Sequence, residues 1–151
     1  MIDVRFPTAL QMMLSLALAH AEDVPRLSSS KLAEGVNSNP TFVRKLLAPL
    51  LKEGLIASTA GRDGGLSLAR PPEAITLEAI YGACAGTGPL WPSREDIKHR
   101  CLVSCNFDGF FSNLAATADR AVREELANQT LAGALNDLRR RQRERSNKRM
   151  R

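Results

Sequence analysis

Cys101 and Cys105 are the residues of this sequence whose type and spacing best suit reactive thiol chemistry. Lys98 and Arg100 flank Cys101, and neighbouring positive charge favours the thiolate, which is the form that attacks oxidants and electrophiles. After oxidation of Cys101 to a sulfenic acid, Cys105 lies close enough in the chain to act as the resolving thiol. The pair is therefore a candidate redox-sensing site.

The same segment allows a metal site as the competing interpretation. His99, Cys101 and Cys105 carry side chains that bind zinc or iron. Their His-x-Cys-x3-Cys spacing matches no common structural zinc pattern, and a [2Fe–2S] cluster usually needs four ligands. We expect no metal and no cofactor, with an iron–sulfur or metal-binding sensor and an inert pair of cysteines as the open alternatives.

The sequence offers no sign of an enzyme. It contains two histidines, and no Ser/His/Asp set has surroundings that suggest a catalytic triad. The run Arg62-Asp63-Gly64-Gly65 is typical of a turn, because a phosphate-binding loop continues into Lys-Ser or Lys-Thr. We therefore expect no catalytic residues.

A second group of polar and basic side chains lies at the start of an expected helix. Asn39 is a capping residue and Pro40 suits the first helical position, so the pair predicts a helix start. Apolar residues then recur at helical spacing and predict a buried face: Val43, Leu46, Leu47, Leu50 and Leu51. The opposite face carries residues suited to DNA bases and phosphates: Asn39, Pro40, Thr41, Arg44 and Lys45.

The elements around this helix predict how it would meet DNA. We expect helices over residues 7–20, 31–36 and 40–53, with a kink or an early end at Pro49, followed by strands over 55–58 and 66–69. Three helices followed by a hairpin are the layout of a winged helix-turn-helix, whose recognition helix enters the major groove. Two further groups are candidate DNA contacts: the start of the second helix at Ser28, Ser29, Ser30 and Lys31, and the hairpin tip at Arg62.

The second half of the chain predicts helices joined by a loop. Thr76 is a candidate cap for a helix that reaches Cys84, and residues 86–96 resemble a loop with two Gly and two Pro. A long helix from Phe107 carries an apolar stripe that we expect to form a dimer interface: Phe107, Phe111, Leu114, Ala118 and Val122. A last helix begins at Thr130 and runs through Leu138.

Charge is concentrated at the end of the chain. The net charge of +5 combines a tail of residues 139–151, which carries +7, with residues 1–138, which carry −2. The tail has no apolar pattern, so we expect it to be solvated and disordered.

The 151 residues and 44% hydrophobic content suit one globular domain with an appendage. No apolar run approaches the ~20 residues of a membrane span, and we expect a cytoplasmic protein without a membrane partner.

Several segments together resemble the Rrf-two (Rrf2) family of bacterial winged-helix transcription regulators. The similarity runs from about Arg5 to Leu138 and implies an expected homodimer, paired through the helix after Phe107, with a sensor region just before it. The segments that carry the resemblance are Ser30-Lys31-Leu32-Ala33-Glu34, Asn39-Pro40-Thr41-Phe42-Val43-Arg44-Lys45-Leu46-Leu47, Leu51-Lys52-Glu53-Gly54-Leu55-Ile56, and the run from Asp63 through Leu77.

The cysteine segment resembles the cluster-free branch of that family, which has a Cys-Pro-Val-Gly-x-Asn motif associated with thiol-based sensing. Cys101, Val103 and Asn106 match the motif, whereas Leu102 and Ser104 replace the proline and glycine, and Cys105 is an extra thiol. Cluster-binding members resemble one another in three closely and evenly spaced cysteines, a pattern absent from this chain. Cys84 stands where similar members have an aliphatic residue, so we expect it in the core. The expected hairpin is the wing of this fold. The family often has a basic residue just before the glycines of the wing, where this chain has Ala60, so Arg62 is the one basic residue at the wing tip.

These observations predict a mainly α fold with a small β-hairpin. We expect a winged helix-turn-helix over residues 1–85, a sensor loop over 86–106, dimerisation helices over 107–138 and a basic tail over 139–151. The expected function is a homodimeric transcriptional regulator, a repressor, that binds a double-stranded DNA operator. Its control would come from a small reactive effector, such as a peroxide, a quinone or another electrophile. The alternative from another class is a winged-helix module for protein–protein interaction.

Overall fold

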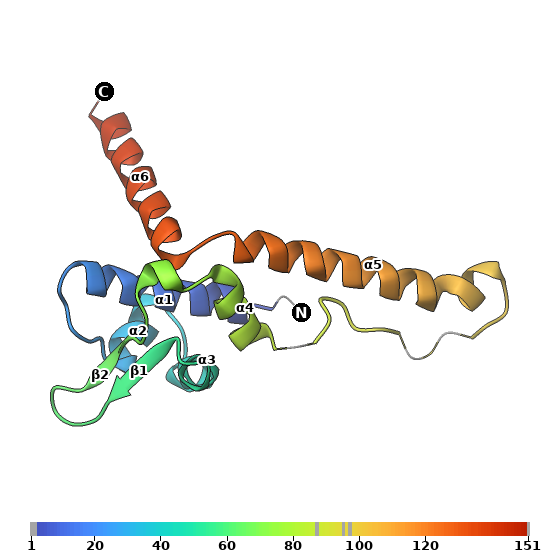
Figure 1. The fold of residues 1–151 in the computed structure, drawn as a ribbon, viewed down its shortest axis with the longest axis horizontal. Helices are drawn as coiled ribbons and strands as arrows, with labels where there is room; N and C mark the ends of the chain where they lie inside the picture. The colour runs from blue at the N-terminus through green and yellow to red at the C-terminus, as the bar shows by residue number, and fades with distance from the viewer. Residues whose placement is uncertain (1–2, 87, 95, 97, 151) are drawn as a thin grey trace.

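The computed structural model describes residues 3–86, 88–94, 96 and 98–150 and has the mainly helical fold with one hairpin that the sequence predicts. Figure 1 shows a body of short helices and the hairpin, from which two long helices extend. In chain order the elements are α1 (Arg5–Ala21), α2 (Ser29–Gly35), α3 (Pro40–Lys52), β1 (Ile56–Thr59), β2 (Gly65–Leu68), the 3-10 helix η1 (Pro72–Ala74), α4 (Leu77–Ala85), α5 (Leu102–Ala127) and α6 (Leu131–Arg149).

One apolar core holds the body together. α1 contributes Met12 and Met13, and α3 contributes Leu50, all of them fully buried. The predicted stripe of α3 points into this core, except that Leu51 is exposed. Pro49 neither ends nor shortens the helix, which continues to Lys52. Gly54 follows with a φ of 64°, the left-handed conformation that closes many helices.

The hairpin is tied to the body by a short bridge. β1 and β2 are antiparallel, with Ile56 opposite Leu68 and Thr59 opposite Gly65. The backbone of Leu27, before α2, exchanges two hydrogen bonds with Leu66 at 2.9 and 2.8 Å. Gly65 has a φ of 146°, and a Cβ atom there would lie 2.8 Å from the carbonyl oxygen of Leu27. Only glycine therefore allows the hairpin to approach the Leu27 segment so closely.

Two element boundaries differ from the sequence prediction by more than two residues. α5 begins at Leu102 rather than near Phe107, because Cys101 and Ser104 form a capping box that starts the helix. Residues 102–106 therefore belong to a helix and not to a sensor loop. α6 continues to Arg149, so the segment predicted to be disordered is helical over residues 139–149. Arg, Gln, Glu and Lys have high helix propensity, which outweighs the missing apolar pattern.

α5 and α6 join the body only in part. The carboxyl-terminal half of α5 packs against α4, while its amino-terminal half extends beyond the body (Figure 1). α6 is anchored on α1 by the buried residues Leu131 and Leu135. In the part of the chain that the structure describes, no helix combines the length and apolar character needed to cross a membrane.

Candidate functional site

The start of α3 presents the polar face that the sequence predicts. Asn39 caps the helix by accepting a hydrogen bond from the Thr41 backbone N–H at 2.7 Å. The five candidate DNA contacts at this helix start are all exposed: Asn39, Pro40, Thr41, Arg44 and Lys45. Since the Asn39 side-chain oxygen is engaged in the cap, its amide N–H₂ remains available to an outside acceptor.

The first turn of α2 offers two backbone amides for a phosphate contact. The Ser28 hydroxyl accepts the Lys31 backbone N–H at 3.1 Å, so that amide is already used by the helix cap. Among the described residues, the backbone N–H groups of Ser29 and Ser30 have no acceptor. Ser28 to Lys31 are exposed, and the start of α2 can therefore face an anion.

These elements meet at one groove. A cavity of about 300 Å³ is lined by Ser29 of α2, Arg44 of α3, Ser58 of β1 and Gly65 of β2, together with apolar residues. The start of α2, the middle of α3 and the hairpin thus share one surface. Arg62 lies exposed in the turn of the hairpin, farther along the wing.

Arg26 is a basic residue near the wing that the sequence prediction missed. Its Nη1 donates to the Asp63 carbonyl oxygen at 3.4 Å, which links the segment before α2 to the tip of the hairpin. No local pattern marks Arg26, because the contact joins residues 37 positions apart. It adds a second positive charge beside the wing turn that carries Arg62.

Cys101 is exposed at the start of α5. Its Sγ lies 3.5 Å from the Ser104 Oγ, and its backbone N–H donates to the same oxygen at 3.0 Å. Hydrogen bonds from the Ser104 side chain, and then from the backbone N–H groups of Ser104 and Val103, lower the pKa of the Cys101 thiol. These are the donors that a helix amino terminus offers to a negative charge, so the position favours the thiolate.

Cys105 and His99 lie close in the chain but have different surroundings. Cys105 is exposed one turn into α5, and its backbone N–H donates to the Cys101 carbonyl oxygen at 3.0 Å. The His99 Nδ1 lies 2.9 Å from the Ser104 carbonyl oxygen, which folds the imidazole back onto the helix. Within the described ranges, no three His, Cys, Asp or Glu side chains gather in a way that would hold a metal ion.

Cys84 belongs to the core, as the sequence predicts. It is 6% exposed, and burial raises the pKa of its thiol to about 11. A thiol with so high a pKa is protonated at neutral pH and reacts slowly. Cys101 and Cys105 are the exposed thiols of the chain.

The predicted dimer stripe divides between two faces of α5. Phe107 stacks on Phe111 with ring centroids 5.5 Å apart, and Trp91 of the preceding loop lies 6.2 Å from Phe111. Phe107, Phe111, Ala118 and Val122 are partly buried within the chain, whereas Leu114 is 49% exposed. Phe110, which the predicted stripe omitted, is 65% exposed. The uncovered apolar face of α5 therefore runs through Phe110 and Leu114.

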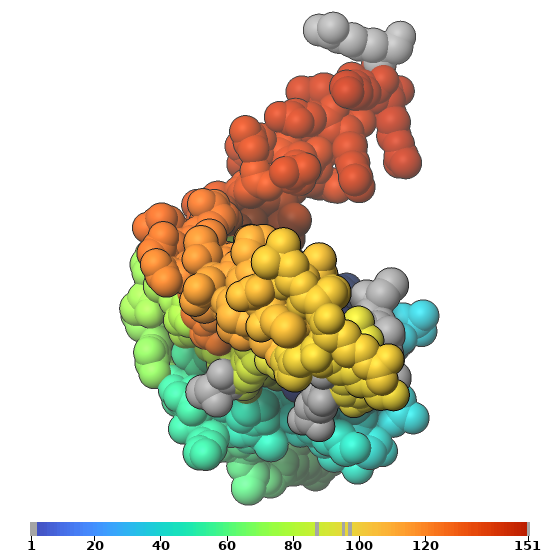
Figure 2. Space-filling model, turned by 90° about the vertical axis from the view of Figure 1, so that its right-hand side faces the viewer, coloured from blue at the N-terminus to red at the C-terminus, as the bar shows by residue number. Residues whose placement is uncertain are grey.

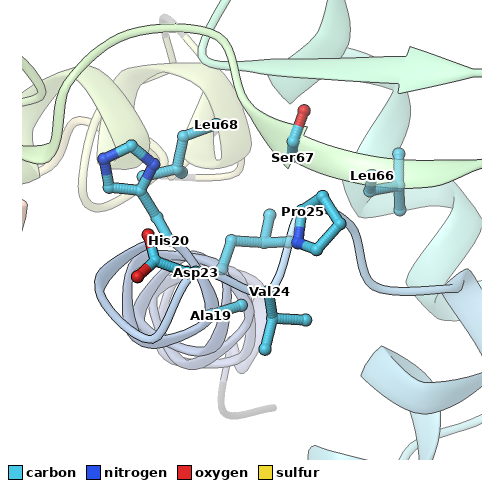
Figure 3. A pocket seen from close by; sticks show the side chains of 9 residues that line it. Ala19, His20, Asp23, Val24, Pro25, Leu66, Ser67 and Leu68 are labelled. Carbon is cyan, nitrogen blue, oxygen red and sulfur yellow. The ribbon is translucent and has the colours of Figure 1, made fainter.

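A cavity of about 280 Å³ between the end of α1 and β2 contains a serine, a histidine and an aspartate (Figure 3). His20 and Asp23 come from α1 and the turn after it, and Ser67 comes from β2. No hydrogen bond joins these three side chains in the described part of the chain, so they lack the nucleophile–base contact of a triad. The site thus gives no support to catalysis.

Comparisons with known proteins agree with this arrangement. The Rrf2 family model, described as an iron-dependent transcriptional regulator, matches residues 2–137. YwnA of Bacillus subtilis, named as an HTH-type transcriptional regulator, is 30% identical over 75% of this chain and 84% of its own.

Two solved structures have the same fold. IscR of T. potens superposes with a TM-score of 0.66 at 25% identity, over 91% of this chain and 88% of that one. The oxidized form of CymR from Staphylococcus aureus gives a TM-score of 0.65 at 27% identity, over 89% and 95%. The relatives and the family are transcriptional regulators rather than enzymes, and the chain belongs to the Rrf2 family of winged-helix transcriptional regulators.

Proposed function

We propose that this regulator is a homodimeric repressor whose binding to a DNA operator is controlled by oxidation or alkylation of Cys101. The contact with DNA rests on the surface where α2, α3 and the hairpin meet, with Arg44 lining it and Lys45 exposed next to Arg44 on α3. Bases would be read by the start of α3, and phosphates would be held by the Ser29 and Ser30 amides and by Arg62. Such an operator would be palindromic, because two copies related by a two-fold axis present two recognition helices.

The uncovered face of α5 supports the homodimer. Phe110 is 65% exposed and Leu114 49%, and Val103 extends their line toward the start of the helix at 68% exposure. Burying a Phe or Leu side chain stabilises by roughly 1.5–3 kcal/mol, so a face of this kind gains from a partner. A second copy of α5 presents the same apolar residues and is self-complementary across a two-fold axis.

The position of Cys101 at the amino terminus of α5 is the observation that carries the sensing proposal. Its thiolate would attack the terminal oxygen of a peroxide, giving a sulfenic acid and releasing hydroxide or alkoxide. A second thiol, from Cys105 or from the partner copy, would then form a disulfide and release water. A quinone would instead be added at the sulfur, giving a thioether.

The consequence for DNA binding follows from the first turn of α5. Cys101 caps α5 with an extended backbone, and the Cys105 backbone N–H one turn later donates to its carbonyl oxygen at 3.0 Å. Residues four apart across a helical turn have Cβ atoms roughly 5–6 Å apart, beyond the roughly 3.5–4.5 Å that a disulfide spans. Oxidation to an internal disulfide would therefore unwind that turn. Because the turn lies at the end of the helix that pairs the two copies, unwinding would shift one winged domain relative to the other.

The description of the Rrf2 model as iron-dependent raises the question of a cluster in this chain. His99, Cys101 and Cys105 do not form a ligand set, since the described residues gather no three ligating side chains and His99 is held by the Ser104 carbonyl. The cysteine arrangement thus fits thiol chemistry better than an iron centre.

The test uses an operator selected by the parent protein from a random duplex library. We expect peroxide or a quinone to release this duplex from the parent, while Cys101→Ser remains bound after the same treatment. Cys105→Ser should still respond to the quinone, which needs no resolving thiol. If Cys101→Ser loses the operator as readily as the parent, Cys101 is not the sensor. If Cys105→Ser alone becomes insensitive, the roles of the two thiols are reversed.

A further inference from the structure

The end of α6 is a dense basic surface that the winged-helix body does not use. Residues 139–149 contain seven Arg and Lys and one Glu, and every one of them is exposed. All of this segment lies beyond residue 137, where the match to the family model ends. Its charge therefore needs an explanation other than the fold.

The surface is a helix without an apolar face. After the buried residues Leu131 and Leu135 and the half-exposed Leu138, α6 has no hydrophobic residue before Met150. A helix of this composition offers a partner charge and hydrogen-bond donors but nothing to bury. Arg dominates the segment, and its planar guanidinium forms paired hydrogen bonds with phosphate oxygens. A phosphate backbone fits this surface better than an apolar or helical partner.

Repulsion within the segment points to an anionic partner. Arg139 and Arg143, and likewise Arg141 and Arg145, stand four positions apart, where like charges destabilise a helix. Asp137 offsets part of this repulsion by forming ion pairs with Arg140 and Arg141. No ion pair reaches Arg143 or Arg145 from the described residues. Phosphate groups along the helix would relieve the remaining repulsion.

The direction of α6 determines which DNA it can reach. In Figure 1 the hairpin turn lies at the lower edge and α6 leaves from the upper edge, and Figure 2 shows the same separation after a quarter turn. The eleven residues 139–149 extend the helix by roughly 16 Å at the rise of an α-helix. This extension points away from the surface that carries Arg44 and Arg62. A duplex held at α3 is therefore not the one that α6 would meet.

We propose that the basic end of α6 is a second, sequence-independent DNA-binding element that holds the phosphate backbone of another duplex segment. One protein would then bridge two stretches of DNA, one at α3 and one at α6. Only the first contact depends on the proposed operator binding. The second needs only phosphate, so it should weaken steeply with added salt.

The experiment measures bridging by the full chain. A biotinylated 30-bp operator on beads is loaded with protein, and capture of a fluorescent 30-bp duplex of unrelated sequence is recorded against salt. The test variant is Arg143→Glu/Arg145→Glu. The matched control is Arg94→Glu/Arg120→Glu, which reverses two exposed charges outside α6. We expect second-duplex capture to fall on the order of tenfold in the α6 variant and to persist in the control. The log–log salt slope should become shallower by about 0.9 for each phosphate that the variant no longer binds.

The other possible outcomes of this experiment contradict the proposed bridging by α6. Equal capture by both variants, loss in both, or no second-duplex capture by a parent that holds the operator would overturn the role of α6. Loss of operator binding in the α6 variant would mean that α6 contacts the same duplex, which also contradicts bridging. If poly-L-glutamate displaces the second duplex as well as unlabelled DNA of equal charge, the surface suits acidic protein instead. Arg44→Ala separates the two proposals, because it should weaken operator loading but leave direct binding of unrelated duplex to α6 unchanged.

Discussion

Arg123 of α5 donates from Nη1 to the Glu78 Oε1 of α4 at 2.9 Å, and this contact joins the long helix to the winged-helix body. The same guanidinium donates to Asp119 at 2.9 Å and to the Gly86 carbonyl oxygen at 3.3 Å. It also lies over the Tyr81 ring at 5.2 Å. One side chain thus ties together α4, the start of the following loop and α5.

Replacing Arg123 with Met should destabilise the protein. Met keeps the apolar stem but removes every charged hydrogen bond, and Asp119 Oδ1 already has no partner among the described residues. Because the pair is about one-third exposed, solvent screens it, and we expect a loss of about 1–2 kcal/mol. Urea unfolding of the parent and the variant measures this loss in the free energy of unfolding. Arg120→Met, an exposed neighbour, should change the free energy of unfolding by less than about 0.5 kcal/mol. Equal losses in the two variants would contradict a linking role for Arg123.

Arg44→Ala should weaken operator binding without changing the fold. Arg44 is exposed on α3 and shares the groove with Ser29 and Ser58, so its loss removes a contact to DNA and none to the core. We expect a cost on the order of 1–3 kcal/mol in binding, and the same range for Lys45→Ala. Fluorescence anisotropy with the selected duplex measures it. Lys52→Ala, at the far end of α3, is the control. Unchanged affinity in both Arg44 and Lys45 variants would refute this use of α3.

Phe110→Asp should dissociate the proposed homodimer. The side chain is 65% exposed in one chain, so the substitution leaves the fold intact while placing a charge in the expected interface. Sedimentation velocity at micromolar concentration should show a monomer, whereas Asn113→Asp, an exposed polar position on the same helix, should stay dimeric. A parent protein that sediments as a monomer would remove the basis for the interface.

Ser104→Ala should slow the reaction of Cys101 with electrophiles at neutral pH. The Ser104 hydroxyl makes the largest contribution to the lowered pKa of Cys101, so its removal raises that pKa and reduces the thiolate fraction. The rate of iodoacetamide alkylation in a Cys105→Ser background should fall at pH 7 and recover at higher pH. Ser112→Ala is the control for helix composition. An unchanged pH profile would show that Ser104 does not tune the thiol.

Local signals in the sequence determined most of the DNA-binding half. Asn39-Pro40 predicted the start of α3, and the apolar spacing of Val43, Leu46 and Leu47 predicted its buried face, because both depend on neighbours within one or two turns. Thr76 likewise caps α4, as its hydroxyl accepts the Ala79 backbone N–H at 3.1 Å. The boundary of α5 was harder, because its capping box uses Cys101 as the cap, a residue that rarely signals a helix start.

The sequence by itself indicated the family and the buried face of α3. It placed Cys101 and Cys105 in a loop before the long helix, whereas the structure places them at the start of that helix. Tertiary structure alone decided which side of the α5 stripe is covered, since Trp91 packs on Phe111 and leaves Phe110 and Leu114 open. It also decided the contacts of Arg123 with Glu78 and of Arg26 with Asp63, which join residues 45 and 37 positions apart. The physical reason is the separation along the chain over which each interaction acts. Capping and helical periodicity act between near neighbours, whereas these contacts exist only once distant segments have packed together.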